Sequence, residues 1–215
     1  MTFDPFGDYE RAGYLRNRFG FGKTAKLQEL EFIAVNDSLE EAFEYLEGRD
    51  YLEYRDVLEV HRLLFETVYP WAGADREKTV PGKSIKKGSV EFCSPTEIPI
   101  ALTYALKIGQ DVDFLREKPG VVLGQLAFAH PFLDGNGRTI MLVFTELLFR
   151  AGIRLDWSRS LKDDYLAALS KEIEEPDKGH LDGYLAPLIG PSSTREQMLD
   201  EVIEVRGLFK TFLQS

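Results

Sequence analysis

The chain has 215 residues, of which 44% are hydrophobic and 12% aromatic, and this favours one folded domain, alone or with a small appendage. Its formal net charge of −10 argues against general binding to nucleic acid or to an anionic membrane surface, and no apolar run is long enough to span a membrane. The single cysteine, Cys93, excludes a disulfide within the chain.

The first residues, 1–11, are polar and acidic and lack the pattern of a signal peptide, which indicates synthesis in the cytoplasm. Export as an effector, by a secretion system that needs no such signal, stays open. Residues 1–22 are rich in glycine, aromatic residues and arginine without a clear period. We expect them to form an ordered arm that lies on the domain.

Two helical regions follow the arm. Apolar residues recur at helical spacing between residues 25 and 46: Leu27, Leu30, Ile33 and Ala34. We expect one or two helices there, because Asp37 or Ser38 can cap a second segment that ends at Gly48. A further helix is predicted over residues 52–68. His61 lies in it, and a packed, hydrogen-bonded histidine is favoured there over a catalytic one.

Residues 75–92 break the helical pattern and form the one basic stretch of an acidic chain. Their cations are Arg76, Lys78, Lys83, Lys86 and Lys87. Four apolar residues can alternate across a turn near Gly88: Val80, Ile85, Val90 and Phe92. This spacing predicts a short β-hairpin near residues 78–92, with a solvated loop as the alternative.

The rest of the chain is predicted to be helical. The stretch Ser94–Glu97 resembles a helix start, and residues 98–115 continue it. Helices are also expected over residues 161–173 and 181–189. The final residues, 191–212, carry an apolar stripe that favours packing on the domain over contact with a partner. We therefore predict one domain over residues 1–190 and a C-terminal helix within 191–215 that packs on it.

One polar loop, His130–Thr139, separates two runs that are apolar nearly all round at helical spacing. Such runs are typical of helices buried on every side. Gly135 and Gly137 allow a sharp turn, and the second helix is expected to begin near Asn136. Its first amide N–H groups lack partners within the helix, so the loop is a candidate anion site.

The charged residues of this loop suit phosphate chemistry. Arg138 is a permanent, planar cation that matches phosphate oxygens. Asp134 is a hard oxygen ligand that can hold Mg²⁺ against phosphates. His130 can accept a proton near neutral pH. Each residue alone is compatible with a structural role, but the combination on one tight loop between buried helices predicts phosphate-group transfer.

The string His130–Arg138 resembles the Fic motif, His-Pro-Phe-x-(Asp/Glu)-Gly-Asn-Gly-Arg, and matches every specified position. Residues 71–76, Trp-Ala-Gly-Ala-Asp-Arg, resemble the segment that precedes the Fic flap, and residues 15–20 resemble the start of stand-alone bacterial Fic proteins. The resemblance covers about residues 14–190. It implies an all-α Fic fold, a helical bundle with a short β-hairpin flap near residues 78–92.

The resemblance also implies a function, protein adenylyltransferase: transfer of AMP from ATP to a Tyr, Thr or Ser hydroxyl of a target protein, with release of pyrophosphate. By position, His130 would be the base, Asp134 would hold Mg²⁺, and Arg138 would neutralise the β- and γ-phosphates. The phosphates would lie in a nest formed by Gly135, Asn136 and Gly137, with the Asn136 side chain helping. The flap residues expected to dock the target are Lys83, Ile85, Val90 and Phe92.

One position departs from the family pattern. Many Fic proteins carry a second arginine three residues after the first, where this chain has Met141. Its absence leaves two alternatives to AMP transfer: transfer of UMP, GMP or phosphate, or a nucleotide-binding regulatory module without turnover. His130 argues against the second alternative.

The sequence also bears on regulation. Self-inhibited Fic proteins carry Ser/Thr-x-x-x-Glu-Gly/Asn on a helix, and no segment of this chain matches that pattern. The resemblance therefore suggests a toxin–antitoxin arrangement, in which a small antitoxin-like partner supplies the glutamate.

Overall fold

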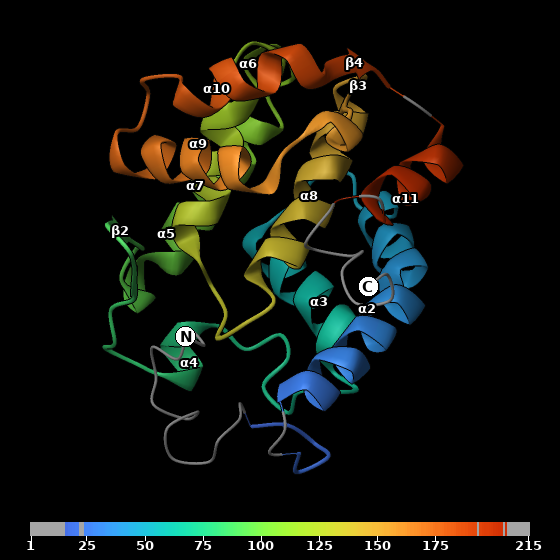
Figure 1. Ribbon diagram of the computed structural model, residues 1–215, viewed down its shortest axis with the longest axis vertical. Helices are drawn as coiled ribbons and strands as arrows, with labels where there is room; N and C mark the ends of the chain where they lie inside the picture. The colour runs from blue at the N-terminus through green and yellow to red at the C-terminus, as the bar shows by residue number, and fades with distance from the viewer. Residues whose placement is uncertain (1–15, 22–23, 193, 204, 206–215) are drawn as a thin grey trace.

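Long helices dominate the structure, as the all-α prediction requires (Figure 1). The computed structural model describes residues 16–21, 24–192, 194–203 and 205. Helices α2 (Thr24–Glu47), α3 (Tyr54–Phe65) and α8 (Asn136–Arg150) pack against one another. Helix α7 (Pro119–Ala129) connects this group to α5 (Ile98–Gly109), α9 (Lys162–Glu174) and α10 (His180–Leu185). No helix in the described ranges is both long and apolar enough to cross a bilayer.

Helix α2 is one continuous helix rather than two. A set of its buried residues spans the predicted break at Asp37 and Ser38: Leu27, Val35, Leu39, Ala42, Phe43 and Leu46. Because this stripe packs against α3 and α8, burial outweighs the local tendency of Asp37 and Ser38 to cap a new helix.

The helix predicted over residues 98–115 is wrong, because the structure divides it into α5 and α6 (Val112–Glu117). A side chain at Gly109 would collide with Leu147, 2.8 Å from the added carbon, so this end of α5 sits tightly against α8. Gln110 then bonds both the N–H and the C=O of Leu52, at 2.6 and 3.0 Å. Asp111 begins α6 by accepting the Phe114 N–H at 3.1 Å.

A second small sheet was not predicted. Strands β3 (Ile153–Leu155) and β4 (Ile189–Pro191) pair antiparallel, with Arg154 opposite Gly190. The helix predicted over residues 181–189 therefore ends at Leu185, and the short 3-10 turn Ala186–Leu188 leads into β4. Another 3-10 turn, Trp157–Arg159, follows β3.

The predicted hairpin is present, but it is shorter than expected. The short helix α4 (Arg76–Thr79) occupies its predicted start, and only β1 (Lys86–Lys87) and β2 (Val90–Glu91) pair. Gly88 has φ +64° in the two-residue turn, a conformation that favours glycine. The segment then enters the 3-10 turn Pro95–Glu97 and α5. We call residues 80–93 the flap.

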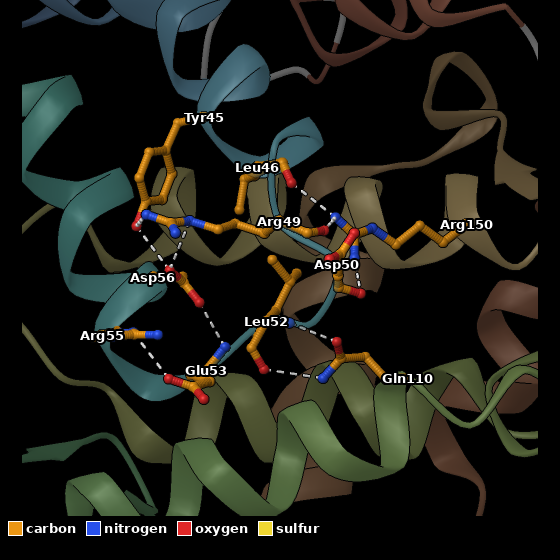
Figure 2. A network of polar contacts seen from close by, with 10 residues as sticks. All are labelled: Tyr45, Leu46, Arg49, Asp50, Leu52, Glu53, Arg55, Asp56, Gln110 and Arg150. Atoms are coloured by element: carbon orange, nitrogen blue, oxygen red, sulfur yellow. Dashed lines mark hydrogen bonds and ion pairs between the residues drawn. The ribbon is translucent and has the colours of Figure 1, made fainter.

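A polar network joins the ends of α2, α3, α5 and α8 (Figure 2). Arg150 of α8 donates to the carbonyls of Leu46 and Arg49, each at 2.7 Å. Asp56 of α3 accepts from the Tyr45 hydroxyl and from the Glu53 N–H, also at 2.7 Å each. These bonds satisfy backbone groups that have no hydrogen-bond partner within their own helix, and they fix α8 relative to α2 and α3.

Helix α11 (Arg195–Ile203) packs on α8 and α2. Arg195 reaches the buried Glu146 of α8, with N–O distances of 2.8 and 3.0 Å. The predicted continuation of this helix to residue 212 lies outside the described residues, as does most of the predicted N-terminal arm. Within residues 16–21, Arg18 bonds the Glu66 carbonyl at 2.6 Å.

Candidate active site

The loop that carries the motif begins and ends on left-handed residues. Helix α7 ends at Ala129, and His130 then has φ +37° and ψ +59°. Gly135 has φ +78° immediately before α8. A side chain on Gly135 would place its first carbon 2.6 Å from the Phe65 ring, so only glycine fits there. His130 has a β-carbon, which makes the left-handed backbone conformation unfavourable. Contacts with the surrounding residues must therefore hold its backbone in place.

Asn136 closes the loop with its side chain. Its Oδ1 accepts the Phe132 N–H and its Nδ2 donates to the Phe132 carbonyl, both at 2.8 Å. This pair of bonds fixes which end of the amide donates. Nδ2 also lies 3.3 Å from His130 Nε2, so that ring nitrogen must accept and carries no proton.

His130 is a neutral imidazole in this setting. Its ring stacks on Phe92 of the flap, with centroids 4.0 Å apart. Loss of solvation, together with the charges of Arg76 and Lys87, lowers the pKa of His130 to about 3. The ring is therefore unprotonated at neutral pH, as a general base must be.

Arg76 ties the flap to the motif loop from inside the protein. Its side chain is fully buried and donates to the carbonyls of His130 at 2.7 Å and Cys93 at 2.8 Å. Its backbone N–H donates to Pro131 at 2.7 Å. Cys93 adds a backbone bond to Phe128 at 3.1 Å. These bonds fix the position of the flap relative to the motif loop, and they hold the carbonyl of His130, whose backbone is left-handed.

His61 supports the loop from the other side, as a fully buried residue of α3. Its Nδ1 accepts the Gly73 N–H at 2.9 Å, so its Nε2 carries the proton and donates to the Asp134 carbonyl at 3.1 Å. Its ring stacks on Phe132 with centroids 3.7 Å apart. Desolvation lowers the pKa of His61 to about 3, so it stays neutral. The predicted packed, hydrogen-bonded histidine is thus present, and its partner is the motif loop.

The start of α8 is the candidate anion site. Asn136, Gly137 and Arg138 form the first turn, where backbone N–H groups have no acceptor within the helix. Arg138 does not point freely into solvent, because its Nη2 forms an ion pair with Glu31 of α2. The other Glu31 oxygen accepts the Tyr69 hydroxyl. The guanidinium lies over the Phe65 ring, 4.8 Å from its centroid.

Asp134 is the candidate metal ligand. It is exposed on the loop, and its Oδ1 accepts the Gly135 N–H at 2.7 Å. Among the residues that the structure describes, no three His, Cys, Asp or Glu side chains cluster as a ready-made metal site. Because Mg²⁺ commonly uses one or two carboxylates together with substrate phosphates, Asp134 beside the anion site fits such an ion.

The predicted target-docking residues divide into two groups. Ile85, Val90 and Phe92 are buried, with exposed fractions of 1%, 4% and 9%, so they anchor the flap instead of facing a target. Lys83 is exposed, while its carbonyl accepts from Arg76 at 3.4 Å.

Sequence reasoning missed Glu31 and the link between His61 and the loop. Glu31 lies four residues after Leu27 and four before Val35, so it falls within the buried stripe of α2. A carboxylate within a buried stripe indicates a nearby partner of opposite charge, because buried charges are normally paired. This was the signal available in the sequence. No comparable signal identified the acceptor of His61.

Comparison with known proteins gives one family. A model described as the Fic/DOC family matches residues 51–148. Protein adenylyltransferase VbhT of Bartonella schoenbuchensis is 30% identical over 168 residues, which are 73% of this chain and 33% of that protein. The chain thus spans a third of the length of this relative. The probable protein adenylyltransferase y4lH of Sinorhizobium fredii is 29% identical over 84% of this chain and 90% of its own.

Solved structures match the fold. BepC of Bartonella tribocorum, crystallised with bound AMPPNP, aligns with a TM-score of 0.68 at 19% identity, covering 86% of this chain and 96% of its own. The N-terminal Fic domain of a Bartonella quintana protein, with bound ADP, gives the same score and identity over 89% of this chain. These likenesses show a shared helical fold.

Proposed function

The chain belongs to the Fic/DOC family, and we propose that it is a protein adenylyltransferase, which transfers AMP from ATP to a Tyr, Thr or Ser hydroxyl of a target protein and releases pyrophosphate. One observation carries the proposal: a single loop holds the unprotonated Nε2 of His130 beside the anion site at the start of α8. Relatives that are named protein adenylyltransferases support the transferred group.

The proposed reaction begins at His130. The target hydroxyl gives its proton to Nε2 while its oxygen forms a bond to the α-phosphorus. The bond from that phosphorus to the bridging oxygen breaks, and pyrophosphate leaves. Arg76 and Asn136 hold His130 in place, through its carbonyl and its Nε2 respectively. Such positioning supplies much of the acceleration in phosphate-group transfer.

The phosphates are assigned to the backbone N–H groups of α8's first turn and to Arg138. The Asn136 side chain is assigned a different role from the one its sequence position suggests. Its oxygen and nitrogen are already bonded to Phe132, so it shapes the loop instead of reaching the phosphates.

Asp134 is the residue that would hold Mg²⁺. When bound, the ion neutralises charge on the phosphate oxygens. The chain's own contribution is to present that carboxylate at the mouth of the anion site, with its backbone carbonyl held by His61.

The proposed target binds along the flap through main-chain pairing, because the apolar flap side chains face inward. A small antitoxin-like partner that supplies a glutamate also belongs to the proposal. Within the described residues, Glu31 already occupies one side of Arg138, so such a partner would meet a partly neutralised site. We place the reaction in the cytoplasm of the producing cell or, after export, of another cell.

Labelled ATP tests the proposal against its alternatives. Cell lysate is incubated with the protein and ATP labelled at either the α- or the γ-phosphorus. AMP transfer labels a protein from α-labelled ATP only, whereas phosphate transfer labels it from γ-labelled ATP only. Parallel reactions with α-labelled UTP and GTP cover the other nucleotides, and binding without label from any nucleotide would indicate a regulatory module.

A further inference from the structure

The pairing of the flap places two neighbouring lysines on opposite faces. Lys87 lies directly opposite Val90, and Lys86 lies opposite Glu91. Residues directly opposite each other in a sheet share a face, and residues two apart along a strand do so too. Lys87 therefore shares the face of Val90 and Phe92.

That face covers the candidate active site. Phe92 stacks on the His130 ring with centroids 4.0 Å apart, and the side chain of Val90 is buried. Lys86 is on the opposite face, where its Nζ lies 2.9 Å from Glu91 Oε2 in an exposed ion pair. The charge of Lys87 acts on the His130 ring, so this ammonium group lies near the motif loop, to which the phosphates are assigned.

The first two turns of α8 carry one cation, Arg138. Met141 stands one turn after Arg138, and its side chain is only 1% exposed within the core. Arg138 itself shares its charge with Glu31. A triphosphate bound at the start of α8 would therefore leave its terminal phosphate to be neutralised from the flap side.

We propose that Lys87 binds the terminal phosphate of the nucleoside triphosphate and so makes the site prefer ATP to ADP. The inference rests on the proposed function, because it takes the anion site of α8 as the place where the nucleotide binds. It assigns to the flap a cationic role in nucleotide recognition, in addition to target docking.

The test compares Lys87→Gln with Lys86→Gln, which removes the same charge from the neighbouring residue on the other face. Titration calorimetry measures ATP and ADP affinity of each variant at equal Mg²⁺. A charge-assisted hydrogen bond corresponds to roughly a ten- to hundred-fold change in affinity. We expect Lys87→Gln to lose about that much ATP affinity and little ADP affinity, while Lys86→Gln stays within about three-fold of the wild type. Lys87→Arg should keep most of the preference.

An unchanged ratio of ATP to ADP affinity in Lys87→Gln would overturn the inference. An equal loss in Lys86→Gln would do the same, because it would indicate a general effect of charge. Failure of the wild type to bind either nucleotide would instead refute the proposed function, and this inference with it. Whether the wild type binds nucleotide therefore distinguishes failure of the inference about Lys87 from failure of the proposed function.

Discussion

Arg138 of the motif forms an ion pair with Glu31, a residue of α2 that precedes it by 107 positions. The side chains of both are largely buried, with exposed fractions of 15% and 8%. The cation assigned to phosphate binding is thus already paired within the protein. A phosphate that reaches the start of α8 must share Arg138 with this carboxylate or displace it.

Glu31→Gln is expected to increase nucleotide affinity and to lower stability. The neutral amide no longer neutralises the Arg138 charge, so that charge can act on a bound phosphate. The same change weakens a buried ion pair whose carboxylate also accepts the Tyr69 hydroxyl, which should lower the free energy of unfolding by about 1–3 kcal/mol. Calorimetry with ATP and urea unfolding measure both effects, with Glu29→Gln on the exposed side of α2 as the control. Weaker ATP binding in Glu31→Gln would mean that Glu31 orients Arg138 instead of competing for it.

His61 predicts a specific pH dependence of stability. Its pKa is about 3 in the folded protein and about 6.5 when unfolded, so the unfolded chain binds more protons as the pH falls. The stability from this residue is complete above about pH 6.5 and is lost as the pH falls toward 3, by roughly 2 kcal/mol between pH 6.5 and 5. His130 contributes in the same direction.

Urea unfolding of wild type and His61→Phe at pH 7 and 5 tests this dependence. The variant keeps an aromatic ring against Phe132 but leaves the Gly73 N–H and the Asp134 carbonyl without their partner, which should cost about 1–3 kcal/mol at pH 7. It should then lose about 2 kcal/mol less than the wild type on acidification. Equal losses in both proteins would show that His61 is not a buried neutral group.

The motif loop was predictable from sequence because its residues are neighbours in the chain. Its supports were not, because His61 and Asp134 lie 73 positions apart and Arg76 and His130 lie 54 apart. The same limit explains the break at Gln110, whose partner Leu52 is 58 residues away. Helical periodicity reports which face is buried, but it carries no information about which distant residue meets that face.

Arg76→Gln is expected to loosen the flap. The shorter amide cannot reach the carbonyls of both His130 and Cys93, and each buried carbonyl left without a donor costs about 1–3 kcal/mol. Hydrogen exchange should therefore speed up at the N–H groups of Phe92 and Cys93, which bond Ile85 and Phe128. Lys78→Gln, an exposed change on the same short helix, is the control. Unaltered exchange in Arg76→Gln would contradict the role assigned to Arg76.

Asp134→Ala is expected to reduce the dependence of nucleotide binding on Mg²⁺, since a Mg²⁺ ion at this position would rely on few protein carboxylates. Calorimetry with ATP in Mg²⁺ and in chelator measures the difference for wild type and variant. The assignment fails if wild-type binding and activity are the same in chelator as in Mg²⁺.

The role of His130 as the base is tested most directly by comparing wild type and His130→Ala in the transfer of labelled AMP from α-labelled ATP to protein. Loss of one general base typically slows a reaction by about a hundred- to ten-thousand-fold. Because the phosphates are assigned to backbone N–H groups and Arg138, ATP affinity should change little. We predict a loss of labelling of that size with ATP still bound, whereas His130→Ala that labels protein as fast as the wild type would contradict the mechanism.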